Sequence, residues 1–354
     1  MRIGVPKEIK PLEGRVGLVP EACAEFVNGG YEVFVQAGAG EASGYSDEAY
    51  RRFGVQLLPD AASLYERSQI VVKVKEPYGA EPEMLRADQL LFCFLHLAAG
   101  PELTQRLLKS GVTAIAFETL ADRGGLPILA PMSDIAGRLS VQIGAKLLQR
   151  PEGGKGILLG GLPAAERGRV VIIGAGQAGG NAARVAASLG AEVTVFDRMR
   201  ERMELMRELG PNVTALYPYG ESLAAAVAVA DLLVGAVLIP GTKAPHLVSR
   251  EQVASMGPGS VIVDISVDQG GCIETTRPTT YETPTFIEEG VIHFGVTNMP
   301  GAVPRSASQA LSAALIPYLH RLLEKDWRQD PRLAEAVNVS GGELVYPALR
   351  EQYS

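Results

Sequence analysis

The chain has 354 residues, with 33 basic and 40 acidic side chains, a formal net charge of -7 and 47% hydrophobic residues. Its length indicates two domains, and an acidic balance without a Lys/Arg run excludes the electrostatic footprint of a nucleic-acid or anionic-membrane binder. The most hydrophobic stretch, residues 223–239, is shorter than a bilayer span and contains Asp231, so it predicts a buried helix followed by a strand.

Cysteine usage bears on the compartment and on metal binding. Cys23, Cys93 and Cys272 are odd in number and far apart, which indicates neither a disulfide framework nor a thiolate metal site. We therefore expect no metal and a reducing, cytoplasmic compartment. The first ten residues reach charged side chains before an apolar core can form, so we expect no secretory signal.

Short apolar runs alternate with longer amphipathic segments, which is typical of parallel sheets and predicts an α/β fold. In the first part of the chain we predict helices at residues 20–27 and 101–109, and strands at 2–5, 32–35, 55–57, 70–75, 90–95 and 113–117. A long helix is predicted at 132–149. A second series then predicts helices at 177–189 and 201–209, and strands at 169–173, 192–196, 232–236 and 260–265. Residues 306–327 predict a long helix that is interrupted near Pro317.

The strongest local motif is RVVIIGAGQAGG at residues 169–180, where an apolar strand leads through G-x-G-x-x-G into an Ala-rich helix. In this pattern Gly174 makes the turn, Gly176 lets the backbone approach a pyrophosphate, and Gly179 allows close packing of helix and strand. The phosphates bind to unpaired amides at the helix N-terminus. The motif therefore predicts a dinucleotide site.

An acidic residue follows where such sites bind the adenosine ribose. The next predicted strand ends at Asp197, eighteen residues after Gly179, close to the roughly 20 residues expected. A carboxylate there accepts hydrogen bonds from ribose hydroxyls and repels a 2'-phosphate, which favours NAD over NADP. A solvated carboxylate at a strand end is the alternative, and Arg198 or Arg202 could instead pair with a phosphate.

Polar residues that end apolar runs are candidates for chemistry, because ligands collect beyond the carboxyl ends of the strands in doubly wound sheets. Lys75 closes the run at 70–75, and His96 closes the run at 90–95. A lysine presents a mobile cation to a carbonyl or carboxylate, and a histidine titrates near neutral pH and can transfer a proton. The alternatives are an exposed strand-end charge and a structural histidine.

Two further residues lie in Gly-rich surroundings. Arg15, in an early loop, could hold a substrate carboxylate through a bidentate pair, or be a solvated loop arginine. Asp268 follows a predicted strand and precedes a glycine pair. Asp264 lies within that strand, so we interpret it as structural.

Around these residues, an ordered series of motifs resembles the alanine dehydrogenase family over essentially the whole chain. The matching motifs are IGVPKE (3–8), KVKEP (73–77), FLHLAA (94–99), PMSDIAG (131–137), GGKGILLGG (153–161), VLIPGTKAP (237–245), VDQGG (267–271), RPTT (277–280) and NMPGAVP (298–304). So many matches in order are far more specific than the dinucleotide motif alone.

The resemblance implies reversible, NAD-dependent oxidative deamination of L-alanine to pyruvate and ammonium. It implies that Arg15 binds the substrate carboxylate and that Lys75 binds the carboxylate or the developing carbonyl oxygen. His96 is implied as the principal acid/base, and Asp268 as a second catalytic group. A base must be free of its proton, so we expect a basic pH optimum for deamination.

The resemblance also implies two Rossmann-like, doubly wound parallel-sheet domains. An NAD-binding domain at residues 131–304 is inserted into a discontinuous substrate/catalytic domain at 1–130 and 305–354. A homohexamer is implied, with small-molecule substrates and with no nucleic-acid or membrane partner. The cofactor contacts implied by the motif and the resemblance are Ser133, Gly174, Gly176, Gln177, Ala178, Gly179, Asp197, Arg202, Val237, Leu238, Ile265, Ser266, Val267, Asp268, Arg277, Asn298 and Met299.

Some features depart from the family pattern, and two related activities compete with the main interpretation. Arg202 stands where the resemblance leads us to expect Lys, and residues 217–220 differ from the expected adenosine-side segment. One rival is the nucleotide-binding subunit of a proton-pumping nicotinamide transhydrogenase, which should lack a complete substrate constellation. Another is a saccharopine-type dehydrogenase. A non-catalytic NADH sensor would need a partner-binding or DNA-binding region, for which no basic segment is visible.

Overall fold

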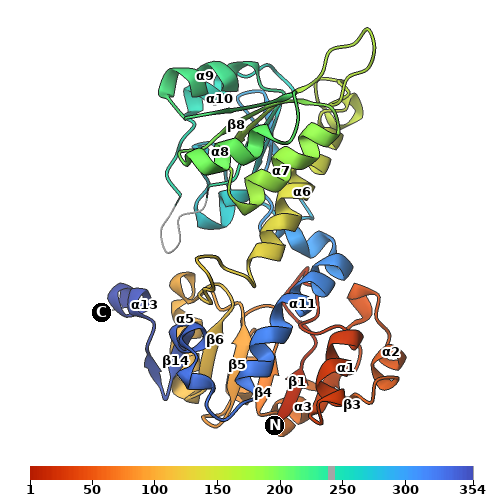
Figure 1. Ribbon diagram of the computed structural model, residues 1–354, viewed down its shortest axis with the longest axis vertical. Coiled ribbons are helices and arrows are strands. Elements are labelled where there is room, and N and C mark those ends of the chain that lie inside the picture. The colour runs from red at the N-terminus through yellow and green to blue at the C-terminus, as the bar shows by residue number, and fades with distance from the viewer. Residues whose placement is uncertain (238–243, 354) are drawn as a thin grey trace. The chain divides into compact units, whose positions relative to one another are not determined.

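The computed structural model describes residues 1–237 and 244–353, and its chain divides into two compact units. Unit 1 comprises Met1–Met132 and Gly301–Ser354, and unit 2 comprises Ser133–Pro300. The chain leaves unit 1 within helix α6 (Ala130–Leu147) and returns to it within the short helix η5 (Met299–Ala302), as the colour sequence in Figure 1 follows. Unit 1 is therefore built from two separate stretches of the chain.

Unit 1 contains an eight-stranded sheet in the order β15-β14-β6-β5-β4-β1-β2-β3. The strands β1 to β6 are parallel, while β14 runs antiparallel to β6 and β15 antiparallel to β14. Their bounds are β1 Arg2–Val5, β2 Glu32–Gln36, β3 Gln56–Leu58, β4 Ile70–Val72, β5 Leu90–Cys93, β6 Thr113–Ala116, β14 Val337–Ser340 and β15 Glu343–Leu344.

Helices cover this sheet, and Figure 1 shows α1 and α11 in front of it. Every residue of β4 and β6 is buried, which explains why these strands are read as unbroken apolar runs. The helices of unit 1 are α1 Pro20–Asn28, α2 Asp47–Arg51, α3 Ala61–Arg67, α4 Glu81–Met84, α5 Pro101–Ser110, α11 Pro304–Leu322, α12 Pro331–Glu335 and α13 Pro347–Tyr353.

The prediction of an interruption near Pro317 was wrong, because α11 runs unbroken through that residue. Proline removes one backbone donor from a helix. Here Leu311, Leu315 and Leu319, spaced four residues apart, are all fully buried. Burial of this apolar stripe stabilises the helix against the missing hydrogen bond.

Two strands end earlier than their apolar runs, so the predicted strands at 70–75 and 90–95 were too long. The strand β4 stops at Val72, where the Glu8 carboxylate accepts the N–H groups of Val74 (2.6 Å) and Lys75 (3.4 Å). The strand β5 stops at Cys93. The Phe94 N–H still donates to the Val74 carbonyl at 3.0 Å, and Glu118, just beyond β6, then accepts the N–H groups of Leu95 and His96. Side-chain acceptors thus replace the ladder where both strands end.

Unit 2 contains a seven-stranded sheet in the order β12-β13-β11-β10-β7-β8-β9, parallel except for β12. Its strands are β7 Arg169–Ile173, β8 Glu192–Phe196, β9 Val213–Leu216, β10 Leu232–Gly235, β11 Val261–Asp264, β12 Thr285–Glu288 and β13 Val291–Phe294. Its helices, besides α6, are α7 Gln177–Ser188, α8 Arg200–Arg207, α9 Gly220–Val229 and α10 Arg250–Ala254.

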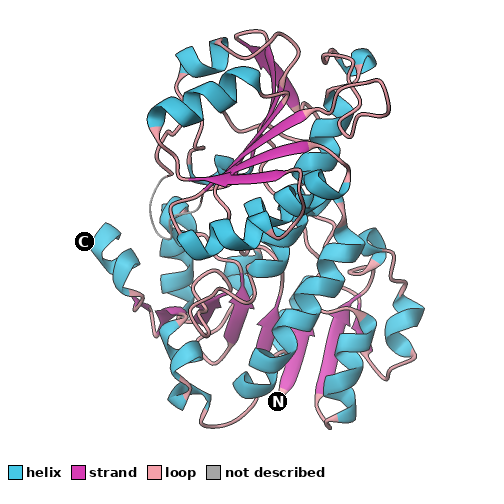
Figure 2. Ribbon diagram, turned by 45° about the horizontal axis from the view of Figure 1, so that its top comes forward, coloured by secondary structure: helices cyan, strands magenta, loops and turns pink. Residues whose placement is uncertain are grey.

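Both faces of the unit 2 sheet are buried. Val170 and Ile172 of β7 pack in one apolar cluster with Ala182 of α7, while Val171 packs in another with Val227 of α9. The alternation of strand side chains therefore places α7 and α9 against opposite faces. Figure 2 shows helices in cyan on both sides of the magenta strands.

The two sheets share one strand order. When the parallel strands of each unit are numbered in chain order, leaving out the antiparallel β12, β3-β2-β1-β4-β5-β6 and β9-β8-β7-β10-β11-β13 both follow the doubly wound pattern 3-2-1-4-5-6. The predicted α/β fold with two mostly parallel, Rossmann-like sheets is confirmed. Ligands bind such sheets where the order reverses, beyond the carboxyl ends of the strands, which directs attention to β1/β4 in unit 1 and β7/β10 in unit 2.

A buried histidine in unit 2 leads to a prediction about stability. The His293 Nε2 atom lies 2.7 Å from the Thr275 hydroxyl, and Nδ1 lies 3.0 Å from the Val291 carbonyl oxygen. Burial lowers the pKa of His293 below its usual 6.5. The unfolded state then binds more protons just below pH 6.5, so the free energy of unfolding falls as the pH drops through that range.

We expect this loss to reach roughly 1.4 kcal/mol for each unit by which the pKa is lowered. Circular dichroism can follow urea unfolding of wild type and His293→Gln between pH 5.5 and 7.5. The loss is the difference between the two proteins in how the free energy of unfolding changes with pH. Parallel pH dependence in both would contradict the prediction.

Candidate active site

The Gly-rich turn of unit 2 has the backbone geometry that its motif predicts. Gly174 adopts a left-handed φ of 96°, and Gly176 is the N-cap of α7. A Cβ on Gly179 would lie 1.7 Å from the Gly174 carbonyl oxygen. The Gly-rich loop and the start of α7 thus lie too close together for any side chain at Gly179. The N-terminal amides of α7 follow directly after the end of β7. This arrangement fits a dinucleotide pyrophosphate.

Asp197 joins the Gly-rich turn to the end of β8. One carboxylate oxygen accepts the N–H of Ala175 at 2.7 Å, the other accepts the N–H of Met199 at 2.8 Å, and the side chain is buried. Arg202 lies 3.6 Å from the same carboxylate. The arginine charge is therefore directed towards Asp197, and the carboxylate lies at the strand end where dinucleotide-binding sheets place an acidic residue.

Other predicted contacts lie at the carboxyl ends of β10 and β11. The N–H of Val237 donates to the Ser266 hydroxyl at 2.9 Å. Ile265, Ser266, Val267 and Asp268 form the short helix η4 (Ile265–Gln269), in which Asp268 is exposed. Leu238 lies outside the described residues.

Asp264 anchors η4. Its carboxylate accepts the backbone N–H groups of Ser266 and Cys272, both at 2.9 Å, and burial raises its pKa. The carboxylate is fully enclosed at the end of β11, so its visible role is structural. Asp268 depends on this anchor for its position in the turn.

The remaining predicted contacts of unit 2 are dispersed over several elements. The Arg277 guanidinium lies 4.2 Å over the Phe286 ring, and Asn298 has a left-handed φ of 60°. The carbonyl of Met299 accepts the Tyr281 hydroxyl at 3.0 Å. Ser133 lies on α6, while Gln177 and Ala178 begin α7. At the end of β9, exposed Tyr217 and Tyr219 have ring centroids 4.9 Å apart.

In unit 1 the first predicted substrate residue, Arg15, is buried in the loop that follows β1. Its Nε and Nη2 donate to the two oxygens of Glu13 at 2.7 and 2.6 Å, and Nη1 lies 3.2 Å from the Met132 sulfur. Burial would raise the pKa of Glu13, but hydrogen bonds and charge from Arg15 lower it. Glu13 therefore holds the guanidinium plane in a fixed orientation.

Lys75 lies beyond β4 and next to the Arg15 pair. Burial lowers the pKa of the Lys75 ammonium, the charge of Arg15 lowers it further, and Glu76 opposes the shift. The lysine is partly buried among charges of both signs, which suits a group that meets an anionic substrate. Arg15 and Lys75 are thus neighbours, although they are sixty positions apart in the chain.

A buried ionic network holds the segment that carries Lys75. The Lys73 ammonium lies 2.7 Å from Glu81 and 3.4 Å from Glu8, with all three side chains buried. Burial would lower the pKa of Lys73, but the charges of Glu8 and Glu81 raise it. Since Glu8 also accepts the Val74 and Lys75 N–H groups, this network sets the backbone position of Lys75.

His96 lies three residues beyond β5, and its side chain is about half exposed. Its Nδ1 lies 3.5 Å from the Glu76 carboxylate, which also pairs with Lys10 from the loop after β1. Because Glu76 contacts the His96 ring, and because its charge and that of Arg15 act on the Lys75 ammonium, we group Arg15, Lys75 and His96 as one candidate cluster. Asp268 is not part of this cluster, because it lies in η4 of unit 2.

The functional residues that sequence reasoning missed are carboxylates. Glu13, Glu76 and Glu118 lie against Arg15, the His96 ring and the His96 backbone respectively. The adjacency of Glu76 to Lys75 was the one signal that pointed to them. Glu118 comes from the end of β6, and nothing in the local sequence around His96 indicates it.

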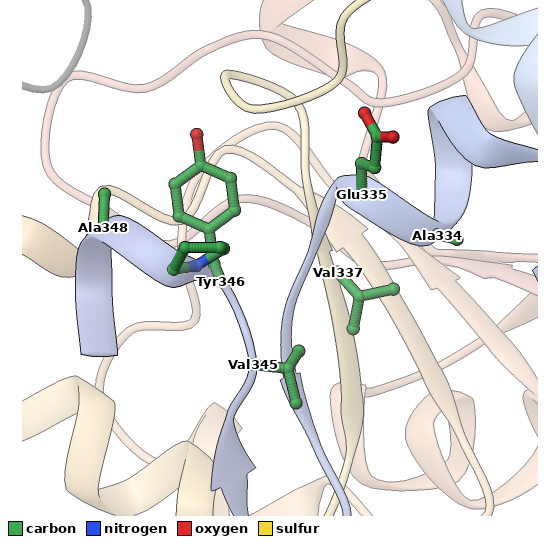
Figure 3. A pocket seen from close by; sticks show the side chains of 7 residues that line it. Ala334, Glu335, Val337, Val345, Tyr346 and Ala348 are labelled. Carbon is green, nitrogen blue, oxygen red and sulfur yellow. The ribbon is translucent and has the colours of Figure 1, made fainter. Parts of the chain in front are cut away.

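A cavity of about 420 Å³ lies elsewhere in unit 1, between α12, β14 and the start of α13. Figure 3 shows its lining, which includes Glu335, Val337, Val345 and Tyr346. None of the predicted site residues lines it, and Glu335 is its only ionisable carboxylate. Within the described residues no group of three or more His, Cys, Asp or Glu side chains could hold a metal. No described helix has the length and apolarity needed to cross a bilayer.

Comparison with known proteins gives consistent matches over the whole chain. Residues 4–136 match the family model "Alanine dehydrogenase/PNT, N-terminal domain" and residues 140–347 match "Alanine dehydrogenase/PNT, C-terminal domain". The alanine dehydrogenase of Halomonas elongata is 46% identical over 100% of this chain and 97% of its own.

Solved structures agree with the sequence matches. An L-alanine dehydrogenase has a TM-score of 0.96 and 48% identity, covering 100% of this chain and 99% of that one. A transhydrogenase from Sinorhizobium meliloti has a TM-score of 0.85 and 27% identity, covering 98% and 100%.

Proposed function

This chain belongs to the alanine dehydrogenase/PNT family, and on that premise we propose that it catalyses the reversible, NAD-dependent oxidative deamination of L-alanine to pyruvate and ammonium. The observation that carries the proposal is the cluster of Arg15, Lys75 and His96 at the carboxyl ends of β1, β4 and β5. Such a cluster supplies two cations for a carboxylate and one group that transfers protons.

Each residue of the cluster has a separate role in this proposal. Arg15, held flat by Glu13, binds the substrate carboxylate through its guanidinium. Lys75 places its ammonium against the carboxylate or the oxygen that develops at Cα. His96 accepts the proton of the water that adds to the substrate imine, and the carbinolamine then loses ammonia. Asp268 of unit 2 is the second catalytic group.

The residues of unit 2 fit NAD. The Gly-rich turn leaves room for a pyrophosphate, and Asp197 provides the carboxylate for the ribose. NAD held by these residues would supply the acceptor for the hydride of the alanine Cα. We assign the remaining contacts to Ser133, Arg202, Val237, Leu238, Arg277, Asn298 and Met299 together with the residues of η4.

Asp197 leads to a prediction about cofactor choice. Its buried carboxylate repels a 2'-phosphate, and the Arg202 charge is already paired with it. We expect kcat/KM for NAD to exceed that for NADP by about 100-fold or more, since each factor of ten needs only about 1.4 kcal/mol. Asp197→Asn should lower the ratio of kcat/KM for NAD to kcat/KM for NADP. Equal use of both nucleotides by the wild-type enzyme would contradict the assignment.

One assay separates the proposed activity from its rivals. NAD reduction is followed with L-alanine, glycine, L-serine and L-lysine in turn, with and without a second nucleotide. An alanine dehydrogenase reduces NAD when L-alanine is added. A transhydrogenase component reduces NAD only when the second nucleotide is present. Two features support alanine: the matched L-alanine dehydrogenase is 48% identical while the transhydrogenase is 27% identical, and the chain retains the residues of the substrate cluster. No NAD reduction with L-alanine would refute the proposal.

The proposal includes a homohexamer in the cytoplasm, on the basis of the family resemblance. Sedimentation equilibrium of the purified protein measures the number of subunits. A monomer or dimer at micromolar concentration would contradict the hexamer without affecting the proposed reaction.

A further inference from the structure

We propose that Glu76 is a positioning residue that holds the His96 ring in the tautomer with its proton on Nδ1, so that Nε2 carries the lone pair used in catalysis. The inference rests on the proposed function for the meaning of that lone pair. The arrangement itself rests on the side-chain contacts of Glu76, which come from two separate segments of unit 1, the loop after β1 and the segment after β5.

The first observation is a buried acceptor that needs a donor. Glu76 Oε2 is enclosed, and no hydrogen-bond partner meets it among the described residues. The His96 Nδ1 atom lies 3.5 Å from it. A buried carboxylate oxygen without a donor is costly, and catalytic hydrogen bonds often tighten only when substrate binds. An N–H on His96 Nδ1 supplies the hydrogen bond that this oxygen lacks.

The second observation is that Glu76 remains ionised. Its other oxygen, Oε1, pairs with Lys10 from the loop after β1. Burial would raise the pKa of Glu76, but the long contact with His96 and the hydrogen bond from Lys10 lower it well below its usual range. An ionised carboxylate only accepts hydrogen bonds. It therefore favours the imidazole tautomer that presents an N–H to it.

The third observation is that the His96 backbone is fixed independently of its ring. His96 has a left-handed φ of 50°. Glu118 Oε1 accepts the His96 N–H at 2.7 Å, and both oxygens of this carboxylate lie 3.2 Å from the Leu95 nitrogen. A backbone in this region persists only when its surroundings hold it. With Glu118 holding the main chain, the contact with Glu76 determines the orientation of the ring.

The charged and titratable groups around His96 come from several elements. Glu76 faces its ring, Glu118 its N–H, and Lys10 lies behind Glu76. From α13, the Tyr353 hydroxyl donates to the carbonyl of Leu97 at 2.7 Å. The Phe94 ring stacks on the imidazole with centroids 5.8 Å apart. Of these groups, Glu76 is the one whose side chain faces a ring nitrogen and can accept a hydrogen bond from it.

The test compares Glu76→Gln and Glu76→Asp with wild type. The amide of Gln can donate to Nδ1 and so stabilise the opposite tautomer. We expect Glu76→Gln to lower kcat for deamination about 100-fold or more while the KM for NAD stays within about twofold. Glu76→Asp keeps a carboxylate that only accepts hydrogen bonds, so the His96 proton should remain on Nδ1.

A matched control and a direct readout complete the experiment. Glu83→Gln removes an exposed carboxylate of unit 1 that pairs with Arg106, and it should leave kcat and its pH profile unchanged. The ¹⁵N spectrum of histidine-labelled protein, with His96 assigned by its loss in His96→Asn, reports which ring nitrogen carries the proton. We expect Nδ1 in wild type and Nε2 in Glu76→Gln.

The outcomes separate this proposal from the proposed function. A Glu76→Gln enzyme with the wild-type kcat, or with the proton still on Nδ1, would overturn the positioning role. If Glu76→Gln does not fold, the ¹⁵N spectrum of wild type decides alone, because a proton on Nε2 there overturns the positioning role equally. If wild type does not oxidise L-alanine, the proposed function fails, while the ¹⁵N measurement still decides the tautomer.

Discussion

Replacement of His96 by Asn is expected to lower kcat for deamination of L-alanine by about 1,000-fold, the range over which a general acid/base contributes. Asn suits this test, because it tolerates the left-handed backbone that His96 adopts at φ 50°. It therefore removes the proton-transfer group while leaving the contact with Glu118 in place. NAD binding, measured by NADH fluorescence, should be unchanged, since the Gly-rich turn lies in unit 2.

The pH dependence of the deamination rate tests the role of His96 a second time. In wild type the deamination rate should rise towards basic pH as the base loses its proton, and in His96→Asn this limb should be absent. His320→Asn is the control, because His320 is exposed on α11 against Phe26 and has no assigned chemistry. A flat wild-type rate across the range where histidine titrates would remove His96 from the proposed role.

Replacement of Gly179 by Ala is expected to abolish measurable NAD binding and to destabilise unit 2. The added Cβ would lie 1.7 Å from the Gly174 carbonyl oxygen and 2.9 Å from its carbon, and both atoms belong to backbone that cannot rotate away. Overpacking costs typically 1–3 kcal/mol where side chains can yield, so we expect about 3 kcal/mol or more here. NADH fluorescence titration and thermal unfolding measure the two effects.

The neighbouring glycine provides the control. A Cβ on Gly180 would first meet the flexible end of Met206 at 3.4 Å, and alanine has the higher helix propensity. Gly180→Ala should therefore bind NADH within a fewfold of wild type and unfold at a similar or higher temperature. If Gly179→Ala behaved in the same way, the close approach of α7 to the turn would be irrelevant to cofactor binding.

Much of the fold could be predicted from local patterns. The strands β1, β7 and β8 have the predicted bounds, since each is an apolar run that ends in residues of different character. The left-handed Gly174 and the close approach at Gly179 are also implied by the motif, because the turn demands them of the backbone itself. These features depend on few distant contacts, which is why sequence alone was sufficient.

The candidate site was predicted in part. Lys75 and His96 were identified by their position after apolar runs, although β4 and β5 end earlier than those runs. The runs were misleading because burial continues beyond hydrogen-bonded pairing: Val74 and Leu95 are buried but give their N–H groups to Glu8 and Glu118. Apolar content reports burial, whereas pairing depends on which acceptors are near.

The sequence by itself determined the fold class and the Gly-rich turn, because these follow from residue type and spacing along the chain, and it supplied the candidates for the reactive side chains. Only the tertiary structure decided which carboxylates serve them. Glu8, Glu13, Glu76 and Glu118 lie at the ends of parallel strands that are neighbours in the sheet but far apart in sequence. Parallel pairing brings these ends to one edge, and pairing between distant segments is a property of the whole chain rather than of any local pattern.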